Sequence, residues 1–412
     1  YKSNPVKSGR KSKKKNTDDE QQSEVDPNIL TNDEKLPLIF ACEKGNNDII
    51  NLLLNCDRTD VNAKLPDGKT TLYVACELEL IDVVKILLKS DDIDINATTN
   101  NGNNPLIVAC EQANKEIIEL LLSYKSDSAN SKSKNNRRSK KTNSTLIDKN
   151  AKNKKGKNAL LIACENQMTD IIEMLLQYSE IDCNVSVRKG MSPLCYACKN
   201  DWENIFNELM KHGADFNYRT REGKSVLYYA CLGKNLNIIR ALLSKVDSSQ
   251  LGMNQPEIEE DSNNESPESE TESDSEFYIQ GDADDELSGE DEDEYSSEDE
   301  FIDEPNSNSP LFISCMNNNI DIFNLIIGRM SSDDINYRDI KGRTLLFIAC
   351  QGGSIDIVKT LVNKYKIDPN IPDNQSKTPL HVACQERNFE IVDFFLNESP
   401  FHVDINAKWD NQ

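Results

Sequence analysis

A pair of small residues, usually Ala-Cys, recurs along the chain, and its spacing constrains the fold more than any other feature. Eight Ala-Cys pairs and one Ser-Cys pair place cysteines at Cys42, Cys76, Cys110, Cys164, Cys198, Cys231, Cys315, Cys350 and Cys384. The successive intervals are 34, 34, 54, 34, 33, 84, 35 and 34 residues. A fixed period of this length indicates stacked supersecondary units that bury their apolar faces against each other. The two long intervals predict segments inserted between otherwise regular units.

Each unit repeats the same order of local signals. A polar residue and a proline, as in Asn104-Pro105, open a short apolar helix, because the polar side chain caps free N–H groups and proline suits the first turn. A second helix over residues 83–88 shows apolar residues at i, i+3 and i+4. An Asp-x-Asn stretch and a glycine turn follow, as at 60–62 and Gly68. Helices this short are marginal alone, since isolated helices below about 12 residues rarely form in water. We therefore predict an all-α solenoid.

One unit carries a recognisable family signature. Residues 378–384 read Thr-Pro-Leu-His-x-Ala-Cys, which resembles the Thr-Pro-Leu-His-x-Ala-Ala signature of the ankyrin-repeat family. The resemblance covers nine units, although only this unit keeps the histidine. It implies an ankyrin-repeat solenoid of about nine helix-turn-helix repeats, interrupted by two long disordered insertions. It also implies that the chain binds proteins.

Charge and composition divide the chain into six segments. Residues 257–304 contain 24 Asp or Glu and no Lys or Arg, and this stretch alone equals the net charge of −24. Such composition is typical of disorder. The predicted segments are a basic disordered tail (1–34), repeats 1–3 (35–124), a basic disordered insertion (125–155), repeats 4–6 (156–246), an acidic disordered insertion (247–306) and repeats 7–9 (307–412).

The ends of the sequence indicate a fragment. The chain does not begin with Met, and its last residues, from Asp404-Ile405-Asn406 onward, parallel the end of an earlier unit at 60–68. We therefore expect the repeats to continue beyond residue 412.

The repeated cysteines could indicate metal, redox chemistry or packing. Packed helices lie about 8–10 Å apart, whereas a disulfide needs Cα atoms within about 7 Å and zinc needs sulfurs at about 2.3 Å. One cysteine per repeat meets neither condition, so we interpret these cysteines as small packing residues. Cys195-x-x-Cys198 falls within one predicted helix and has no second pair nearby. We predict no catalytic, cofactor or metal site, and no enzyme activity.

The residue after each repeated cysteine provides the candidate contact position. In the ankyrin family this position faces the concave groove, so the resemblance implies a row of carboxylates in repeats 1–4 that suits a basic protein partner. Ordinary solvated glutamates are the alternative. The candidate protein-binding residues are Glu43, Glu77, Glu111, Glu165, Lys199 and Trp202.

The insertions suggest two further interpretations. Several serines of the acidic insertion precede Asp or Glu by three residues, which is typical of sites for acid-directed kinases. The candidate phosphorylation sites are Ser273, Ser288, Ser296 and Ser297. We also predict that the acidic insertion masks the basic one by charge attraction, with two independent solvated loops as the alternative.

These observations predict a non-catalytic protein–protein interaction scaffold that binds through the concave helix face and the hairpin tips. The partner's identity is left open, and we expect no small-molecule substrate and no membrane insertion. One alternative is an electrostatic regulator of chromatin or nucleic-acid-associated proteins, although residues 126–157 lack the aromatics needed for base stacking. Another is the binding region of a larger enzyme. We expect an intracellular protein, with the cytoplasm favoured over the nucleus.

Overall fold

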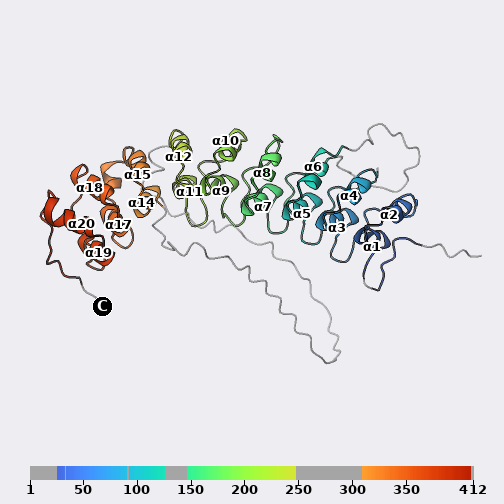
Figure 1. The fold of residues 1–412 in the computed structure, drawn as a ribbon, viewed down its shortest axis with the longest axis horizontal. Helices are drawn as coiled ribbons and strands as arrows, with labels where there is room; N and C mark the ends of the chain where they lie inside the picture. The colour runs from blue at the N-terminus through green and yellow to red at the C-terminus, as the bar shows by residue number, and fades with distance from the viewer. Residues whose placement is uncertain (1–25, 33, 91, 126–145, 247–308, 410–412) are drawn as a thin grey trace, which may run out of the picture. The chain divides into compact units, whose positions relative to one another are not determined.

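The computed structural model describes residues 26–32, 34–90, 92–125, 146–246 and 309–409. The contacts divide the chain into two compact units, Tyr1–Ile147 (unit 1) and Asp148–Gln412 (unit 2). In the described residues, the regular elements are helices, together with two isolated β-bridges. The helices come in nine consecutive pairs joined by loops (Figure 1). The predicted all-α solenoid of paired helices is therefore confirmed.

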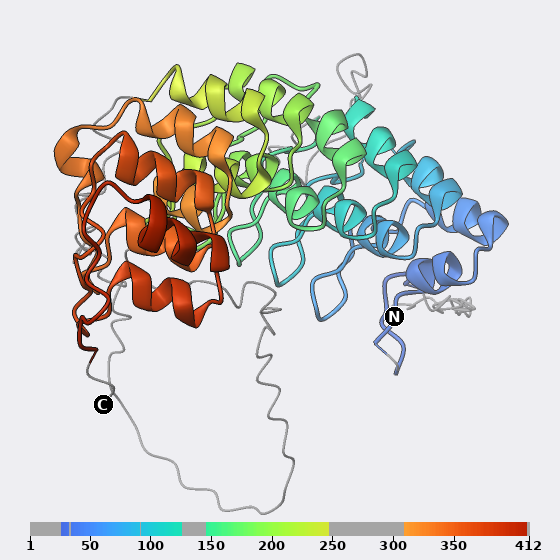
Figure 2. The same cartoon turned by 60° about the vertical axis from the view of Figure 1, so that its left-hand side comes forward.

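Unit 1 contains three helix pairs stacked side by side. The first helices of successive pairs contact each other, and the second helices do the same, so the unit has two layers (Figures 1 and 2). The first helices are α1 (Pro37–Glu43), α3 (Thr71–Glu77) and α5 (Pro105–Glu111). The second helices are α2 (Asn47–Leu54), α4 (Ile81–Leu87) and α6 (Lys115–Ser123).

Unit 2 continues the pattern with six pairs. Its first helices are α7 (Ala159–Glu165), α9 (Pro193–Lys199), α11 (Val226–Gly233), α14 (Pro310–Met316), α17 (Leu345–Gln351) and α19 (Pro379–Gln385). Its second helices are α8 (Thr169–Leu175), α10 (Glu203–Lys211), α12 (Leu236–Leu243), α15 (Ile320–Ile327), α18 (Ile355–Asn363) and α20 (Phe389–Asp393). A short helix, α16 (Ser332–Ile335), follows α15, and a π-helical turn, η2 (Phe394–Glu398), extends α20. Helix α11 contacts α14, so the sixth and seventh repeats are neighbours although residues 247–308 separate them in the sequence.

The predicted caps explain where the first helices begin. The side chains of Asn104 and Ser192 accept hydrogen bonds from backbone N–H groups three residues later, and proline occupies the first turn of both helices. Thr378 does the same for His381, whose ring also accepts from the Thr378 backbone N–H and so completes a capping box. The Asn/Ser/Thr-Pro signals in the sequence therefore marked true helix starts.

The repeated cysteines lie near the C-terminal ends of the first helices. Eight of the nine are buried, and Cys384 in the last pair is exposed. Burial raises the pKa of the Cys42 and Cys110 thiols to about 12, because a thiolate loses its hydration there. Packing is tightest between α9 and α11, where a Cβ added at Gly233 would lie 2.1 Å from the Cys198 carbonyl oxygen. These contacts support the interpretation of the cysteines as packing residues.

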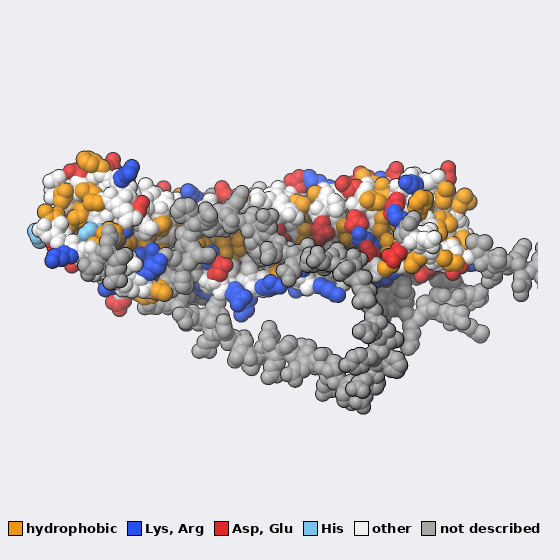
Figure 3. Space-filling view, turned by 90° about the horizontal axis from the view of Figure 1, so that it is seen from below, with side chains coloured by type: hydrophobic (Ala, Val, Ile, Leu, Met, Phe, Trp, Pro, Cys, Tyr) orange, Lys and Arg blue, Asp and Glu red, His pale blue; other side chains and the backbone are white. Residues whose placement is uncertain are grey.

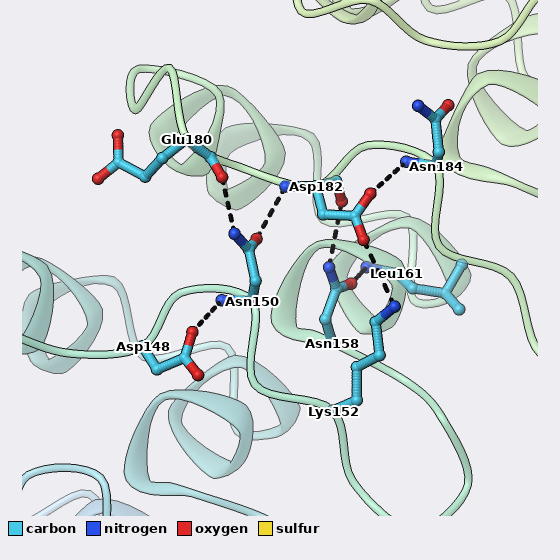
Figure 4. A network of polar contacts seen from close by, with 8 residues as sticks. All are labelled: Asp148, Asn150, Lys152, Asn158, Leu161, Glu180, Asp182 and Asn184. Atoms are coloured by element: carbon cyan, nitrogen blue, oxygen red, sulfur yellow. Dashed lines mark hydrogen bonds and ion pairs between the residues drawn. The ribbon is translucent and has the colours of Figure 1, made fainter.

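In several Asp-x-Asn stretches, the asparagine side chain ties its loop to the next repeat. In Figure 4, Asn150 Nδ2 donates to the Glu180 carbonyl at 2.7 Å, and its Oδ1 accepts from the Asp182 N–H at 2.8 Å. Asp182 Oδ1 accepts from the Asn184 N–H at 3.0 Å, which fixes the loop that holds the next asparagine. The same pair of bonds to the following repeat recurs at Asn28, Asn62, Asn184 and Asn370. We call this series the asparagine ladder.

The ladder shows where the repeats extend into segments predicted as tail and insertion. Asn28, in the predicted tail 1–34, bonds to the Arg58 carbonyl and the Asp60 N–H at 2.7 and 2.8 Å. Residues 146–155 of the predicted basic insertion form the loop that contains Asn150. The remaining predictions for residues 1–25, 126–145 and 247–306 lie outside the described residues, as do the predicted masking contact between the insertions and the serines 273, 288, 296 and 297.

Candidate functional site

The candidate glutamates occupy the last residue of their first helices, and each bonds to a residue eight positions earlier. In unit 1, Lys35 Nζ lies 2.6 Å from Glu43 Oε2, and Lys69 Nζ lies 3.0 Å from Glu77 Oε1. The loop before each first helix therefore supplies a cation to the end of that helix. The Glu43 and Glu77 side chains are 25% and 31% exposed, so both pairs remain accessible.

The pairing of Lys69 is tight enough to change its acidity. Partial burial acts to lower the pKa of Lys69, but the hydrogen bond and the charge of Glu77 outweigh it, so that the pKa is raised. The ammonium also lies 5.8 Å from the centroid of the Tyr73 ring, a cation–π geometry. Lys69 is thus held between a carboxylate and an aromatic ring at the edge of the helix layer.

The third glutamate has a neutral partner. Glu111 accepts a hydrogen bond of 3.4 Å from Asn103 Nδ2, again eight residues earlier. Successive first helices of unit 1 therefore bring Glu43, Glu77 and Glu111 into one row, in which Glu43 and Glu77 each pair with a lysine. The sequence indicated the carboxylates but did not indicate their lysines.

Unit 2 begins with the same Lys–Glu arrangement, and its next first helix carries a different side chain at the helix-end position. Lys157 Nζ lies 2.9 Å from Glu165 Oε2 at the end of α7. On the next first helix, Lys199 takes the place of the glutamate. Trp202 is the N-cap of α10 and is half-buried, so it lies in the turn between helices rather than on the helix end. The structure therefore places Trp202 at a different level of the repeat from the other candidates.

The last two repeats form a hollow at the same level. It has a volume of about 330 Å³ and lies between the loops and ends of α17 and α19. Gln351 and Gln385 occupy the helix-end position there, and Lys377 hydrogen-bonds Gln385. Arg343 Nε donates to Asp339 Oδ2 at 2.7 Å, and Ile340 is 57% exposed at the rim. The hollow therefore combines an apolar rim with cationic and amide side chains.

Ile340 and the loop cations were missed from the sequence. They lie outside the helix motifs, and their importance depends on the loops bending toward the helix ends. A usable signal was present: a Lys or Arg stands eight residues before the helix-end position at Lys35, Lys69, Lys157, Arg343 and Lys377. Reading the two positions together would have predicted the pairs.

Metal binding and membrane insertion would each need a particular arrangement of side chains or helices in the described part of the chain. Its residues contain no group of three or more His, Cys, Asp or Glu arranged to hold a metal ion. None of its helices combines the length and the apolar character that crossing a membrane requires.

Comparison with known proteins identifies the family. A family model of ankyrin repeats in three copies matches residues 16–99, 38–135, 93–187, 138–220, 179–253 and 311–408. The chain belongs to the ankyrin-repeat family. Ankyrin repeats generally mediate protein–protein interactions, and their proteins are typically non-catalytic scaffolds. No curated protein matches the chain.

Solved ankyrin-repeat structures resemble parts of the chain. An ankyrin-repeat protein named EF0377 is 22% identical, covers 51% of this chain and 97% of its own, and has a TM-score of 0.40. An ankyrin-repeat domain from Acinetobacter baumannii AYE is 22% identical, with coverage of 50% and 96% and a TM-score of 0.41. The ankyrin-repeat domain of Bcl-3, a member of the IkappaB protein family, is 24% identical, with coverage of 52% and 88% and a TM-score of 0.41.

Proposed function

We propose that this ankyrin-repeat protein is a non-catalytic scaffold that binds a protein partner through its first-helix ends and the loops beside them. The observation that supports this most is the recurrence of partly exposed Lys–Glu pairs at one position of the repeat. Lys35–Glu43 and Lys69–Glu77 in unit 1 and Lys157–Glu165 in unit 2 are all accessible. A partner segment that crosses successive repeats meets the same chemistry at each step.

The partner we infer carries basic side chains along an extended segment. Each pair already neutralises its own charge, so the partner's cation must share a carboxylate with the resident lysine. Half-exposed carboxylates contribute modestly, typically below about 1 kcal/mol for a solvated ion pair. Affinity therefore depends on several repeats acting together, and on apolar contacts such as those offered by Ile340.

The test begins with affinity capture by the intact chain and continues with purified partner and variants. Glu77→Gln combined with Glu165→Gln removes one carboxylate in each unit. Because the two contributions add to about 1–2 kcal/mol, we expect binding to weaken about 10-fold. The variant should retain its helical content, since both side chains lie partly in solvent.

A matched control separates the helix-end position from charge in general. Glu119 in α6 and Glu173 in α8 are exposed on second helices. Glu119→Gln combined with Glu173→Gln makes the same change in net charge, and we expect binding to be unchanged. Equal weakening by both double variants would assign the effect to net charge and would reject the proposed surface.

The proposal also places the protein in a reducing compartment inside the cell. Support comes from its twelve cysteines, all of which are free in the structure and ten of which are buried. Disulfides are rare where glutathione and thioredoxin keep thiols reduced.

A further inference from the structure

Three neighbouring loops of unit 2 form a strongly basic surface. They precede α7, α9 and α11 and comprise residues 152–157, 187–191 and 218–224, which we call the basic loops. Together they contain nine Lys or Arg and one acidic residue, Glu222. The loops at 63–69 and 97–103 in unit 1 contain two Lys and one Asp. In Figure 3, which views the molecule from the side of the loops, blue Lys and Arg side chains gather along that side.

Several of these cations are used within the repeats. Lys152 lies 3.4 Å from Asp182, Lys157 pairs with Glu165, and Lys224 Nζ lies 2.6 Å from Glu222. These contacts neutralise part of the surface and fix the loops.

Four other cations form no ion pair with the described residues. These four cations, all exposed at the loop tips, are Lys154, Arg188, Lys189 and Arg221. The Arg221 N–H donates to the Lys189 carbonyl at 2.7 Å, so the second and third tips lie together. The surface therefore presents uncompensated positive charge on a fixed backbone.

The second tip keeps its cations in a strained backbone. Arg188 and Lys189 have φ of 48° and 54°, whereas glycine takes the left-handed position in the loops on either side, at Gly156 and Gly223. Each non-glycine residue in this region costs about 1–2 kcal/mol. Asn-Gly would satisfy the turn without strain, so the second tip keeps two cations at a conformational cost.

We propose that the basic loops are a binding surface for the acidic segment of the same chain, residues 257–304. That segment carries 24 Asp or Glu and no Lys or Arg, which complements the loop tips in sign. It is joined to α12 and α14, both in unit 2, so it cannot diffuse away from the loops. The proposal goes beyond the proposed function, because it concerns a contact within one molecule.

Chain length allows the contact. The basic loops belong to repeats 4–6, and α12 belongs to repeat 6, so the farthest tip lies two repeats away, about 16–20 Å along the stack at 8–10 Å per repeat. An extended chain spans about 3.3 Å per residue, so fewer than about 20 residues cover this distance. Tethering also holds the segment at an effective concentration in the millimolar range. A free polyanion such as nucleic acid must compete with it and is repelled by its charge.

Zero-length carbodiimide crosslinking of the full chain tests the contact, because it joins a lysine amine to a carboxylate only where the two touch. The monomer is isolated after reaction at low protein concentration and its crosslinks are mapped. Lys211, 69% exposed at the end of α10, is the control lysine in the same unit. We expect crosslinks from 257–304 to Lys154 and Lys189 to exceed those to Lys211 about 10-fold at low salt, and to fall to the Lys211 level at 1 M salt.

A variant checks that the charges cause the contact. Lys154→Gln, Arg188→Asn, Lys189→Gly and Arg221→Gln are combined, which removes the four cations and suits the turn. In this variant we expect cleavage of 257–304 by a Glu-specific protease to become about 5-fold faster, while Lys211→Gln leaves the rate unchanged. Three results would each overturn the proposal. They are crosslinks that form only between two chains, crosslinking of Lys211 equal to that of Lys154 and Lys189, and binding of a duplex oligonucleotide to the basic loops of the intact chain at 0.15 M salt. None of these outcomes depends on an external protein partner.

Discussion

Removing one rung of the asparagine ladder tests whether side-chain amides, rather than helix contacts alone, fix the register of neighbouring repeats. Asn150→Ala eliminates the bond to the Glu180 carbonyl and the bond from the Asp182 N–H, at 2.7 and 2.8 Å. Each net hydrogen bond contributes about 0.5–1.5 kcal/mol. Since both partners lie near solvent and water can replace the amide, we expect unit 2 to lose about 1–2 kcal/mol of unfolding free energy.

Urea unfolding followed by far-UV circular dichroism measures the loss, and hydrogen exchange localises it. The Asp182 N–H should exchange about 10-fold faster in Asn150→Ala, because about 1.4 kcal/mol of protection disappears. Asn406→Ala is the matched control. It lies in the same Asp-x-Asn motif, and its side chain has no hydrogen bond to the described residues. Equal destabilisation by the two variants, or unchanged exchange at Asp182, would refute the role given to the ladder.

Three further predictions concern packing, the strained turn and the buried thiols. Gly233→Ala should lower the free energy of unfolding in urea by about 2–3 kcal/mol, because its Cβ would meet the Cys198 carbonyl oxygen at 2.1 Å. Gly328→Ala is the control and should change the free energy little, because its Cβ meets nothing closer than 3.6 Å. An unchanged free energy of unfolding in Gly233→Ala would contradict the packing. Lys189→Gly should raise thermal stability by about 1 kcal/mol, because it relieves a positive φ, and a destabilised variant would show that the turn is not strained. Burial raises the pKa of Cys110 from 9.0 to about 12, so the thiol favours the folded state below pH 9 and this contribution declines as pH rises toward 12. Cys110→Ala should therefore flatten the alkaline loss of stability, and an unaltered pH profile would contradict that assignment.

The repeat period in the sequence predicted most of the fold. Helix starts at Asn104 and Thr378 followed from capping chemistry, and the second helices followed from their apolar periodicity. The loops were harder to delimit because their composition is ambiguous. Residues 146–155 are rich in lysine, which predicts that they belong to the basic insertion, yet Asn150 belongs to the ladder. The Asp-x-Asn pattern marks the loop better than charge does, since its bonds to the next repeat need that spacing.

Only part of the candidate site could be predicted from the sequence. The repeat period alone predicts that a glutamate recurs at one position of the repeat, as at Glu77 and Glu165. Its partner needed a second observation, the cation eight residues earlier, because Lys69 and Lys157 reach those carboxylates only when the loop folds back on its own helix. The strain at Arg188 and Lys189 was also hidden, since φ depends on the turn type that the neighbouring loops impose.

The most direct measurement of the central claim is a hydrogen-exchange footprint of the intact chain with and without its captured protein partner. If the first-helix ends and their loops form the binding surface, protection should appear at residues 69–77, 157–165 and 340–351, and the second helices α4 and α8 should exchange as in the free chain. Protection confined to second helices such as α4 and α8, with 69–77 and 340–351 unchanged, would contradict the account.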